Sequence, residues 1–131
     1  MDFPGYYNFS LTYARLKQMI ENPESNREWK RMLSSISGIY IILDIRSGKQ
    51  YIGSAYGRGG IWGRWRKYSK NPTGGNKHIK AVLDKYPNRY NSFQFSILRV
   101  MEPGTTKNQI IEQESKIKEK LGSRAYGLNL N

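Results

Sequence analysis

The sequence predicts an α/β fold, in which strands and helices share one domain, and three observations support this prediction. The apolar residues of 38–44 stop at a turn cluster around Gly48 and resume over 51–55, a pattern typical of a β-hairpin. Residues 93–100 alternate apolar and polar side chains, as a half-buried third strand does. The segment 107–121 repeats its apolar side chains at helical spacing. A chain of 131 residues has room for one such domain with a modest core.

Residues 1–37 are expected to form a small helical cap that packs on the main domain, 38–131. Thr12 is a suitable N-cap for a first helix, which should end near Glu21 because an Asn-Pro pair follows. A second short helix is expected over 28–33 from its apolar stripe. The five basic and four acidic residues of this region nearly cancel. We therefore expect the cap to serve packing, with partner binding as the alternative.

Two helices are expected between the hairpin and the third strand. The first, over 61–68, has an apolar stripe with Arg64 at its edge. It follows a glycine-rich loop, 56–60, which lacks the Gly-Lys-Ser/Thr ending of a phosphate cradle, so nucleotide binding receives little support. The second, over 76–86, should leave the single histidine, His78, facing solvent. That histidine is expected to be an exposed surface residue that binds no ligand, with metal ligation as the alternative.

The charge of the chain is strongly basic and unevenly distributed. The formal net charge is +12, and the stretch from Arg46 to Arg89 holds eleven basic residues against one acid, Asp84. Such a field favours a polyanionic partner, most commonly a nucleic-acid backbone. A membrane surface is less well supported because no basic helix has an apolar face, and a merely soluble basic protein is the remaining alternative. The residues expected to contact nucleic acid are Lys49, Arg58, Arg66, Lys67, Lys70, Lys77 and Lys80.

The composition also bears on location and on metal chemistry. No apolar run approaches the roughly 20 residues that span a bilayer, and the N-terminus lacks the features of a secretory signal. We therefore expect a soluble, cytoplasmic protein. The chain has no cysteine, which excludes disulfides and thiolate metal sites. Any metal must be held by oxygen atoms or by His78.

Two tyrosines of the hairpin are candidate functional residues. If the turn has an even number of loop residues, directly paired positions have an odd sum, so Tyr40 and Tyr51 share one face of the sheet. The alternative is that both are ordinary strand tyrosines, a residue type that strands favour.

Glu114 is the third candidate, because it lies in the apolar sector of the last helix. A carboxylate there is costly unless a cation or strong donors meet it. A structural salt bridge, with Arg64 as a possible partner, is the alternative to a metal site. The tail alternates apolar and amide side chains, so Asn129 could return to the sheet.

Five short elements occur in order along the chain: Gly38-Ile39-Tyr40, Tyr51-Ile52-Gly53, Arg64-Trp65, Glu114 within Ile-Ile-Glu-Gln-Glu, and Gly127-Leu128-Asn129. This series resembles the GIY-YIG nuclease family, which includes homing endonucleases, repair nucleases and restriction enzymes. A lone Gly-Ile-Tyr would carry no weight, but five elements in order are specific. The resemblance covers residues 38–131.

The resemblance implies a three-stranded antiparallel sheet flanked by helices, with a shallow site on one sheet face. By position, Glu114 resembles the ligand of one divalent ion, Mg²⁺ or Mn²⁺, and Arg64 resembles the arginine beside the scissile phosphate. Tyr40 and Tyr51 resemble the paired tyrosines, one of which activates or orients the attacking water, and family members differ in which one. Asn129 matches an asparagine often found near the phosphate.

The residue chemistry agrees with hydrolysis of a phosphodiester. A carboxylate such as Glu114 suits a hard ion that acts as a Lewis acid, and Arg64 offers a fixed charge with bidentate reach. A phenol with a pKa near about 10 is a poor base unless its surroundings lower that pKa or a metal shares the task. The chain has Tyr68 where some relatives carry a histidine, and Ser54 where others carry a lysine, and both patterns occur among active members.

The sequence therefore predicts a metal-dependent DNA endonuclease, and the alternative is a non-catalytic nucleic-acid-binding module that keeps the fold and the charge. Single-stranded, double-stranded and branched DNA all remain open. We expect weak sequence preference or selectivity for DNA structure, unless a protein partner or a homodimer contributes specificity.

Overall fold

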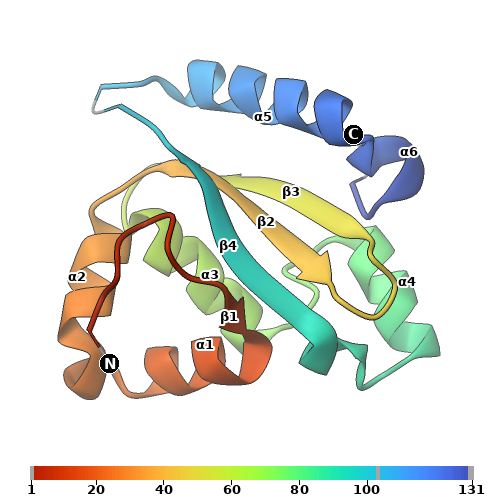
Figure 1. The fold of residues 1–131 in the computed structure, drawn as a ribbon, viewed down its shortest axis with the longest axis horizontal. Helices are drawn as coiled ribbons and strands as arrows, with labels where there is room; N and C mark the ends of the chain where they lie inside the picture. The colour runs from red at the N-terminus through yellow and green to blue at the C-terminus, as the bar shows by residue number, and fades with distance from the viewer. Residues whose placement is uncertain (1, 103, 130–131) are drawn as a thin grey trace.

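The computed structural model describes residues 2–102 and 104–129. Its strands are β1 (Leu11–Thr12), β2 (Gly38–Asp44), β3 (Gln50–Ala55) and β4 (Phe93–Val100). Its helices are α1 (Tyr13–Glu21), α2 (Arg27–Ser34), α3 (Gly60–Lys70), α4 (Lys77–Lys85), α5 (Lys107–Leu121) and α6 (Ser123–Tyr126), with 3₁₀ turns η1 (Pro23–Asn26) and η2 (Arg89–Ser92). The strands form an antiparallel sheet in the order β1-β4-β2-β3. Helices α5 and α6 lie along one side of this sheet, and α1, α2 and α3 lie along the other (Figure 1).

The predicted α/β class is confirmed, and each predicted helix and strand is present with bounds that differ by at most one or two residues. The predicted N-cap is also present, because the Thr12 side chain accepts a hydrogen bond from the Arg15 main-chain N at 3.1 Å. The expectation of three strands was incomplete. Strand β1 adds a fourth by pairing Leu11 with Phe95 and Thr12 with Gln94. Two residues are too few to show a strand period, so this pairing depends on tertiary contacts that no local pattern reveals.

The main core lies between the sheet and helices α1, α2 and α3. Trp65 is fully buried at its centre, with ring centroids 5.6 Å from Phe95 and 6.0 Å from Tyr40. Leu16 of α1 and Trp29 of α2 are buried in the same cluster. The N-terminal helices thus share a core with the sheet. The division of the chain into a cap, 1–37, and a main domain, 38–131, stays a prediction.

The opposite face of the sheet is buried as well. Ile39 and Ile52, which point away from Tyr40 by strand alternation, are fully buried, as is Ile110 of α5. Both faces of the β-hairpin therefore carry buried side chains. Among the described residues, no helix combines the length and the apolar character needed to cross a membrane.

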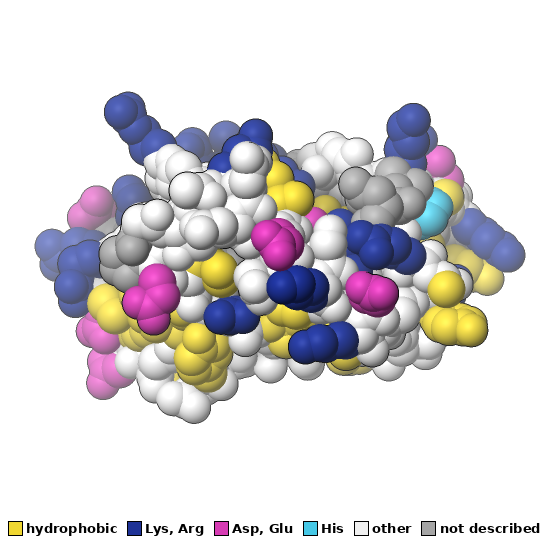
Figure 2. All heavy atoms as spheres, turned by 90° about the horizontal axis from the view of Figure 1, so that it is seen from above, with side chains coloured by type: hydrophobic (Ala, Val, Ile, Leu, Met, Phe, Trp, Pro, Cys, Tyr) yellow, Lys and Arg dark blue, Asp and Glu magenta, His cyan; other side chains and the backbone are white. Residues whose placement is uncertain are grey.

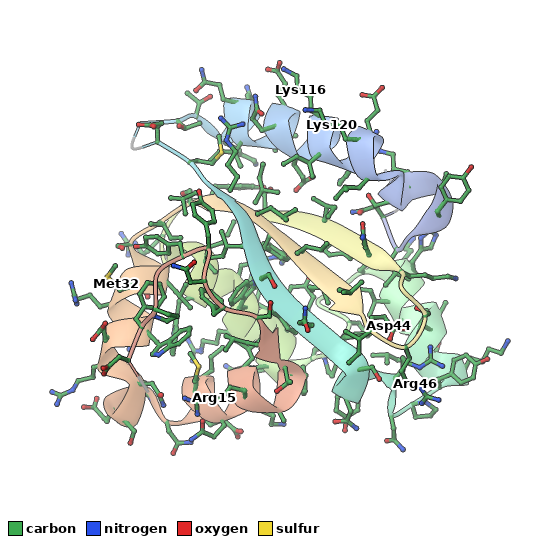
Figure 3. The ribbon with its side chains drawn as sticks, viewed as in Figure 1. Arg15, Met32, Asp44, Arg46, Lys116 and Lys120 are labelled. Carbon is green, nitrogen blue, oxygen red and sulfur yellow. The ribbon has the colours of Figure 1, made fainter. Side chains whose placement is uncertain are left out.

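The hairpin turn is organised by Asp44, at the end of β2 (Figure 3). Its buried carboxylate accepts hydrogen bonds from the Arg46 main-chain N at 3.0 Å and the Ser47 hydroxyl at 2.7 Å. It also pairs with Arg89, whose Nη1 lies 3.2 Å away. The main-chain N of Asp44 bonds to the Lys49 carbonyl, which leaves four residues in the loop. The turn is thus even in length, which is the condition for placing the two hairpin tyrosines on one face.

Candidate active site

A cavity of about 400 Å³ lies where β3, the loop 56–60, α3 and α5 meet. Its lining includes Tyr51 of β3, Arg64 and Lys67 of α3, and Glu114 of α5. Arg58 reaches it from the loop. Residues that the sequence singled out separately therefore lie around one hollow, although they are far apart along the chain.

Tyr40 lies behind the cavity wall and is fully buried. The register pairs Ile42 with Tyr51, so Tyr40 and Tyr51 lie on the same face, as predicted, with ring centroids 6.4 Å apart. The Tyr40 hydroxyl accepts a hydrogen bond from Arg64 Nε at 3.2 Å and lies 3.2 Å from the Tyr68 hydroxyl. Tyr40 is thus tied to the arginine of the cavity and not itself part of its lining.

Gly53 explains why the second motif ends in glycine. It is the residue of β3 directly paired with Tyr40, and the Tyr40 ring lies across it. A Cβ at position 53 would lie 2.5 Å from the Tyr40 hydroxyl oxygen, a distance that a real Cβ does not tolerate. The glycine therefore leaves the space through which the buried phenol reaches Arg64.

Arg64 is held from two sides. Its Nε donates to Tyr40, and its Cζ lies 5.4 Å from the centroid of the Tyr68 ring, a cation–π distance. Within the described part of the chain, the structure records no hydrogen bond from either of its Nη atoms. Because a guanidinium binds a phosphate through two parallel donors, this arrangement fixes the group and leaves its outer edge for an anion.

The ionisation of this cluster follows from burial. Burial, with a smaller contribution from Tyr51, raises the pKa of Tyr40 well above its usual range, although Arg64 opposes the shift. Burial also raises the pKa of Tyr68. For Arg64, burial alone would lower the pKa, but the oxygens of Tyr40 and Tyr68 outweigh it and raise the pKa. At neutral pH the site thus holds two neutral phenols and one guanidinium cation.

Glu114 faces the cavity from α5, and its salt-bridge partner differs from the one suggested by the sequence. Its Oε2 pairs with Lys118 Nζ at 2.8 Å, whereas Arg64 bonds to Tyr40. The Lys118 and Glu114 side chains are only 5% and 15% exposed. Lys118 stands one helical turn after Glu114, so this spacing was the sequence signal that could have identified it.

Asn129 returns to the sheet, as the tail pattern allowed. It is buried, and its Oδ1 accepts from the Ile52 main-chain N while its Nδ2 donates to the Ile52 carbonyl, both at 2.8 Å. Leu128 extends this contact by donating its main-chain N to the Gln50 carbonyl. The tail is thus fastened to the outer edge of β3 on both sides of Tyr51. A place for Asn129 beside the phosphate stays a prediction.

The sequence profile of the GIY-YIG catalytic domain matches residues 36–128 of the chain. The chain belongs to the GIY-YIG family. The catalytic domain of the homing endonuclease I-TevI is 28% identical, covers 72% of this chain and 98% of its own, and superposes with a TM-score of 0.57. A mutant of the catalytic domain of intron endonuclease I-TevI is 27% identical, covers 73% of this chain and 94% of its own, and has a TM-score of 0.59. The comparison with curated proteins finds no match.

The GIY-YIG site of this chain offers a divalent ion one carboxylate, Glu114. Among the described residues there is no group of three or more His, Cys, Asp and Glu side chains that could hold a metal. Mg²⁺ is commonly bound by one or two carboxylates, with water and substrate phosphates as its remaining ligands. The donor set therefore fits a hard ion whose coordination is completed by water and phosphate.

The basic residues predicted to bind nucleic acid are distributed over several surfaces of the GIY-YIG domain. Arg58 and Lys67 line the cavity, while Arg66 and Lys70 line hollows farther along α3. The other three predicted residues lie outside the cavity lining: Lys49 in the hairpin turn, and Lys77 and Lys80 on α4. Lys80 is paired with Asp84 at 2.9 Å, and the nearby His78 is exposed, as expected.

Tyr56 is a lining residue that the sequence analysis did not single out. It stands in the loop after β3, is 41% exposed and forms part of the cavity wall. Lys107 of α5 places its Nζ 5.1 Å from the Tyr56 ring centroid. The signal available in the sequence was an aromatic residue three positions after the second motif, at the start of a glycine-rich loop, because aromatic rings are common in nucleic-acid sites.

Proposed function

We propose that this protein is a metal-dependent endonuclease that hydrolyses DNA phosphodiester bonds in the cavity between β3, α3 and α5. The observation that carries the proposal is the placement of Arg64 and Glu114 in the lining of one cavity, together with Tyr51. Phosphodiester hydrolysis needs a fixed cation for the phosphate, a ligand for a metal and a group that orients water. The two similar structures are, by name, catalytic domains of an endonuclease, which supports the same reading.

Arg64 is the phosphate-binding group in this proposal. Its Nε bond to Tyr40 fixes the plane of the guanidinium, and its Nη edge is left for two phosphate oxygens. Because the pKa of Tyr40 is raised, the phenol stays neutral and keeps its role as a hydrogen-bond partner. Tyr40 is thus a positioning residue that acts through Arg64.

Glu114 would hold one divalent ion, either Mg²⁺ or Mn²⁺. When bound, such an ion supplies Lewis-acid stabilisation of the charge that develops on the phosphate. Lys118 holds Oε2 of the carboxylate, which restricts the carboxylate's orientation in the way that outer partners orient metal ligands.

Tyr51 is the tyrosine proposed to touch the attacking water. It is half-buried and lines the cavity, whereas Tyr40 is fully buried behind the wall. We expect Tyr51→Phe to lower the single-turnover cleavage rate by roughly 10²-fold, the usual size of a proton-transfer contribution.

Tyr40→Phe should lower the single-turnover cleavage rate by less than Tyr51→Phe does. When added to Arg64→Lys, it should lower the rate little further, since both changes break the same hydrogen bond.

Tyr40→Phe has a second readout, which is independent of cleavage. The unfolded chain releases the Tyr40 proton above about pH 10, while the folded chain retains it because its pKa is raised. The free energy of unfolding should therefore fall as the pH rises above that value, and Tyr40→Phe should reduce this fall. Urea unfolding at several alkaline pH values measures it, and an unchanged pH dependence would contradict the burial argument.

The proposed activity is tested by incubating supercoiled plasmid, single-stranded DNA and branched DNA with the protein. Cleavage should occur with Mg²⁺ or Mn²⁺, stop with a chelator and return when excess metal is added. Mapped cut sites should show weak sequence preference or a preference for DNA structure. A sharp cleavage motif from the isolated protein would contradict this last expectation.

A non-catalytic DNA-binding module is the second candidate function. The observation that favours it is that Arg58 and Lys67 line the cavity and form no ion pair with any residue that the structure describes. DNA binding without cleavage of any of these substrates, with either metal, would select it. Specificity in either case could come from a protein partner or a second copy of the chain.

A further inference from the structure

The active-site cavity is the first of several hollows that follow one another around α3. The cavity and the next hollow share Arg58 and Gly63 in their linings. That second hollow and a third share Ile20 and Arg66. The three hollows therefore adjoin one another, from the cavity to helices α1 and α2, which lie against α3.

These three hollows are lined by exposed basic side chains from four segments of the chain. Helix α1 contributes Lys17 and helix α2 contributes Lys30, while the loop 56–60 and α3 contribute the rest. We call this set the basic track, and its members are Lys17, Lys30, Arg58, Arg66, Lys67 and Lys70.

The members of the basic track are cations that ion pairs leave unneutralised. Within residues 2–102 and 104–129, none of its members forms an ion pair, whereas Lys116 on α5 pairs with Glu112 at 3.4 Å. Figure 2 shows the face over α5, where Lys and Arg side chains lie among Asp and Glu. Among the described residues that line the second and third hollows, Glu21 is the acidic one. A row of unpaired cations that leads into a cavity complements a long polyanion better than a small one.

We propose that α1 and α2 form part of the DNA-binding surface, with Lys17 and Lys30 contacting phosphates of the DNA whose scissile bond enters the cavity. This inference rests on the proposed function and extends it to residues 1–37, for which the sequence favoured packing and left partner binding as the alternative. The near-zero net charge of residues 1–37 gave no indication of this DNA-binding role, because a net charge summed over a segment does not show where the individual charges lie. Helices α1 and α2 therefore have two roles, since their apolar sides complete the core and their basic sides extend the DNA path.

The test compares two variants that lose the same net charge. Lys17→Gln with Lys30→Gln removes the outer track, and Lys116→Gln with Lys120→Gln removes two cations from α5. Figure 3 labels Lys116 and Lys120 on α5, on the far side of the sheet from α1. The affinity of each full-length variant for a short labelled DNA duplex is measured by fluorescence anisotropy over a range of salt, with a chelator present to prevent cleavage.

The slope of log affinity against log salt is negative, and the track variant should reduce its magnitude by about 1.8, since each lost phosphate contact removes about 0.9. Each single substitution should give about half of this change, and the α5 variant should leave the slope unchanged. Circular dichroism checks that both variants fold.

Three results would overturn the inference, and they can be told apart. An unchanged slope in the track variant refutes it while leaving the proposed function intact. Equal losses in both double variants show a general effect of net charge. If the parent protein binds no DNA duplex at low salt, the inference fails together with the proposed substrate, and plasmid cleavage then shows whether the proposed activity fails too.

Discussion

Glu114→Gln should lower the single-turnover rate of DNA cleavage by roughly 10³-fold or more, because it removes the carboxylate that would hold the metal. The glutamine side chain has nearly the same shape, so the cavity and the basic track stay in place. DNA binding measured with a chelator present should therefore change little. The variant separates catalysis from binding, and excess Mg²⁺ or Mn²⁺ should not restore its rate.

The chain offers a matched control for this change two residues earlier on the same helix. Glu112 is exposed and pairs with Lys116 at 3.4 Å, so Glu112→Gln removes the same charge from the outer side of α5. We expect wild-type cleavage from it. Equal cleavage by the wild-type protein and Glu114→Gln would instead indicate a contaminating nuclease or a different metal site.

Glu114→Gln also leaves Lys118 without its carboxylate, and the loss of one partner from a nearly buried pair destabilises a protein. Thermal unfolding must therefore accompany the rate measurement. A second variant, Glu114→Gln with Lys118→Met, removes both charges and should recover stability without recovering cleavage. Recovery of cleavage in this double variant would contradict the role given to Glu114.

Strict periodicities explain what could be predicted from the sequence. Strand side chains alternate with a period of two, so an even turn is sufficient to place Tyr40 and Tyr51 on one face of the sheet. The helical period likewise predicted that Glu114 lies on the inward, apolar side of its helix. Both results needed only local geometry and one assumption, the even turn that Asp44 closes.

The features that the sequence did not predict correctly depend on tertiary contacts, which local periodicity does not reveal. Strand β1 exists only through its pairing with β4. The cation beside Glu114 is Lys118, while Arg64 bonds to a phenol. The basic field read along the sequence also divides in the fold, since α4 lies away from the cavity lining while the N-terminal helices contribute to the basic track.

Arg64→Ala should lower the cleavage rate by roughly 10²- to 10³-fold, the loss typical of removing one preorganised group that stabilises transition-state charge. Arg64→Lys is the more informative change. It keeps the positive charge but loses the Nε bond to Tyr40 and the planar edge that binds two oxygens. If geometry matters as much as charge, the lysine variant should recover only a small part of the rate.

Arg66→Ala provides the control for Arg64, because Arg66 lies two residues further along α3 and belongs to the basic track, not to the cavity lining. It should weaken DNA binding and reduce the salt dependence by about 0.9, yet leave the single-turnover rate at saturating protein unchanged. The two arginines of α3 would then have different roles, since Arg66 would contribute to DNA binding and Arg64 would bind the phosphate that is cut. Full activity of Arg64→Lys would show that a point charge suffices, and the hydrogen bond to Tyr40 would then have no part in catalysis.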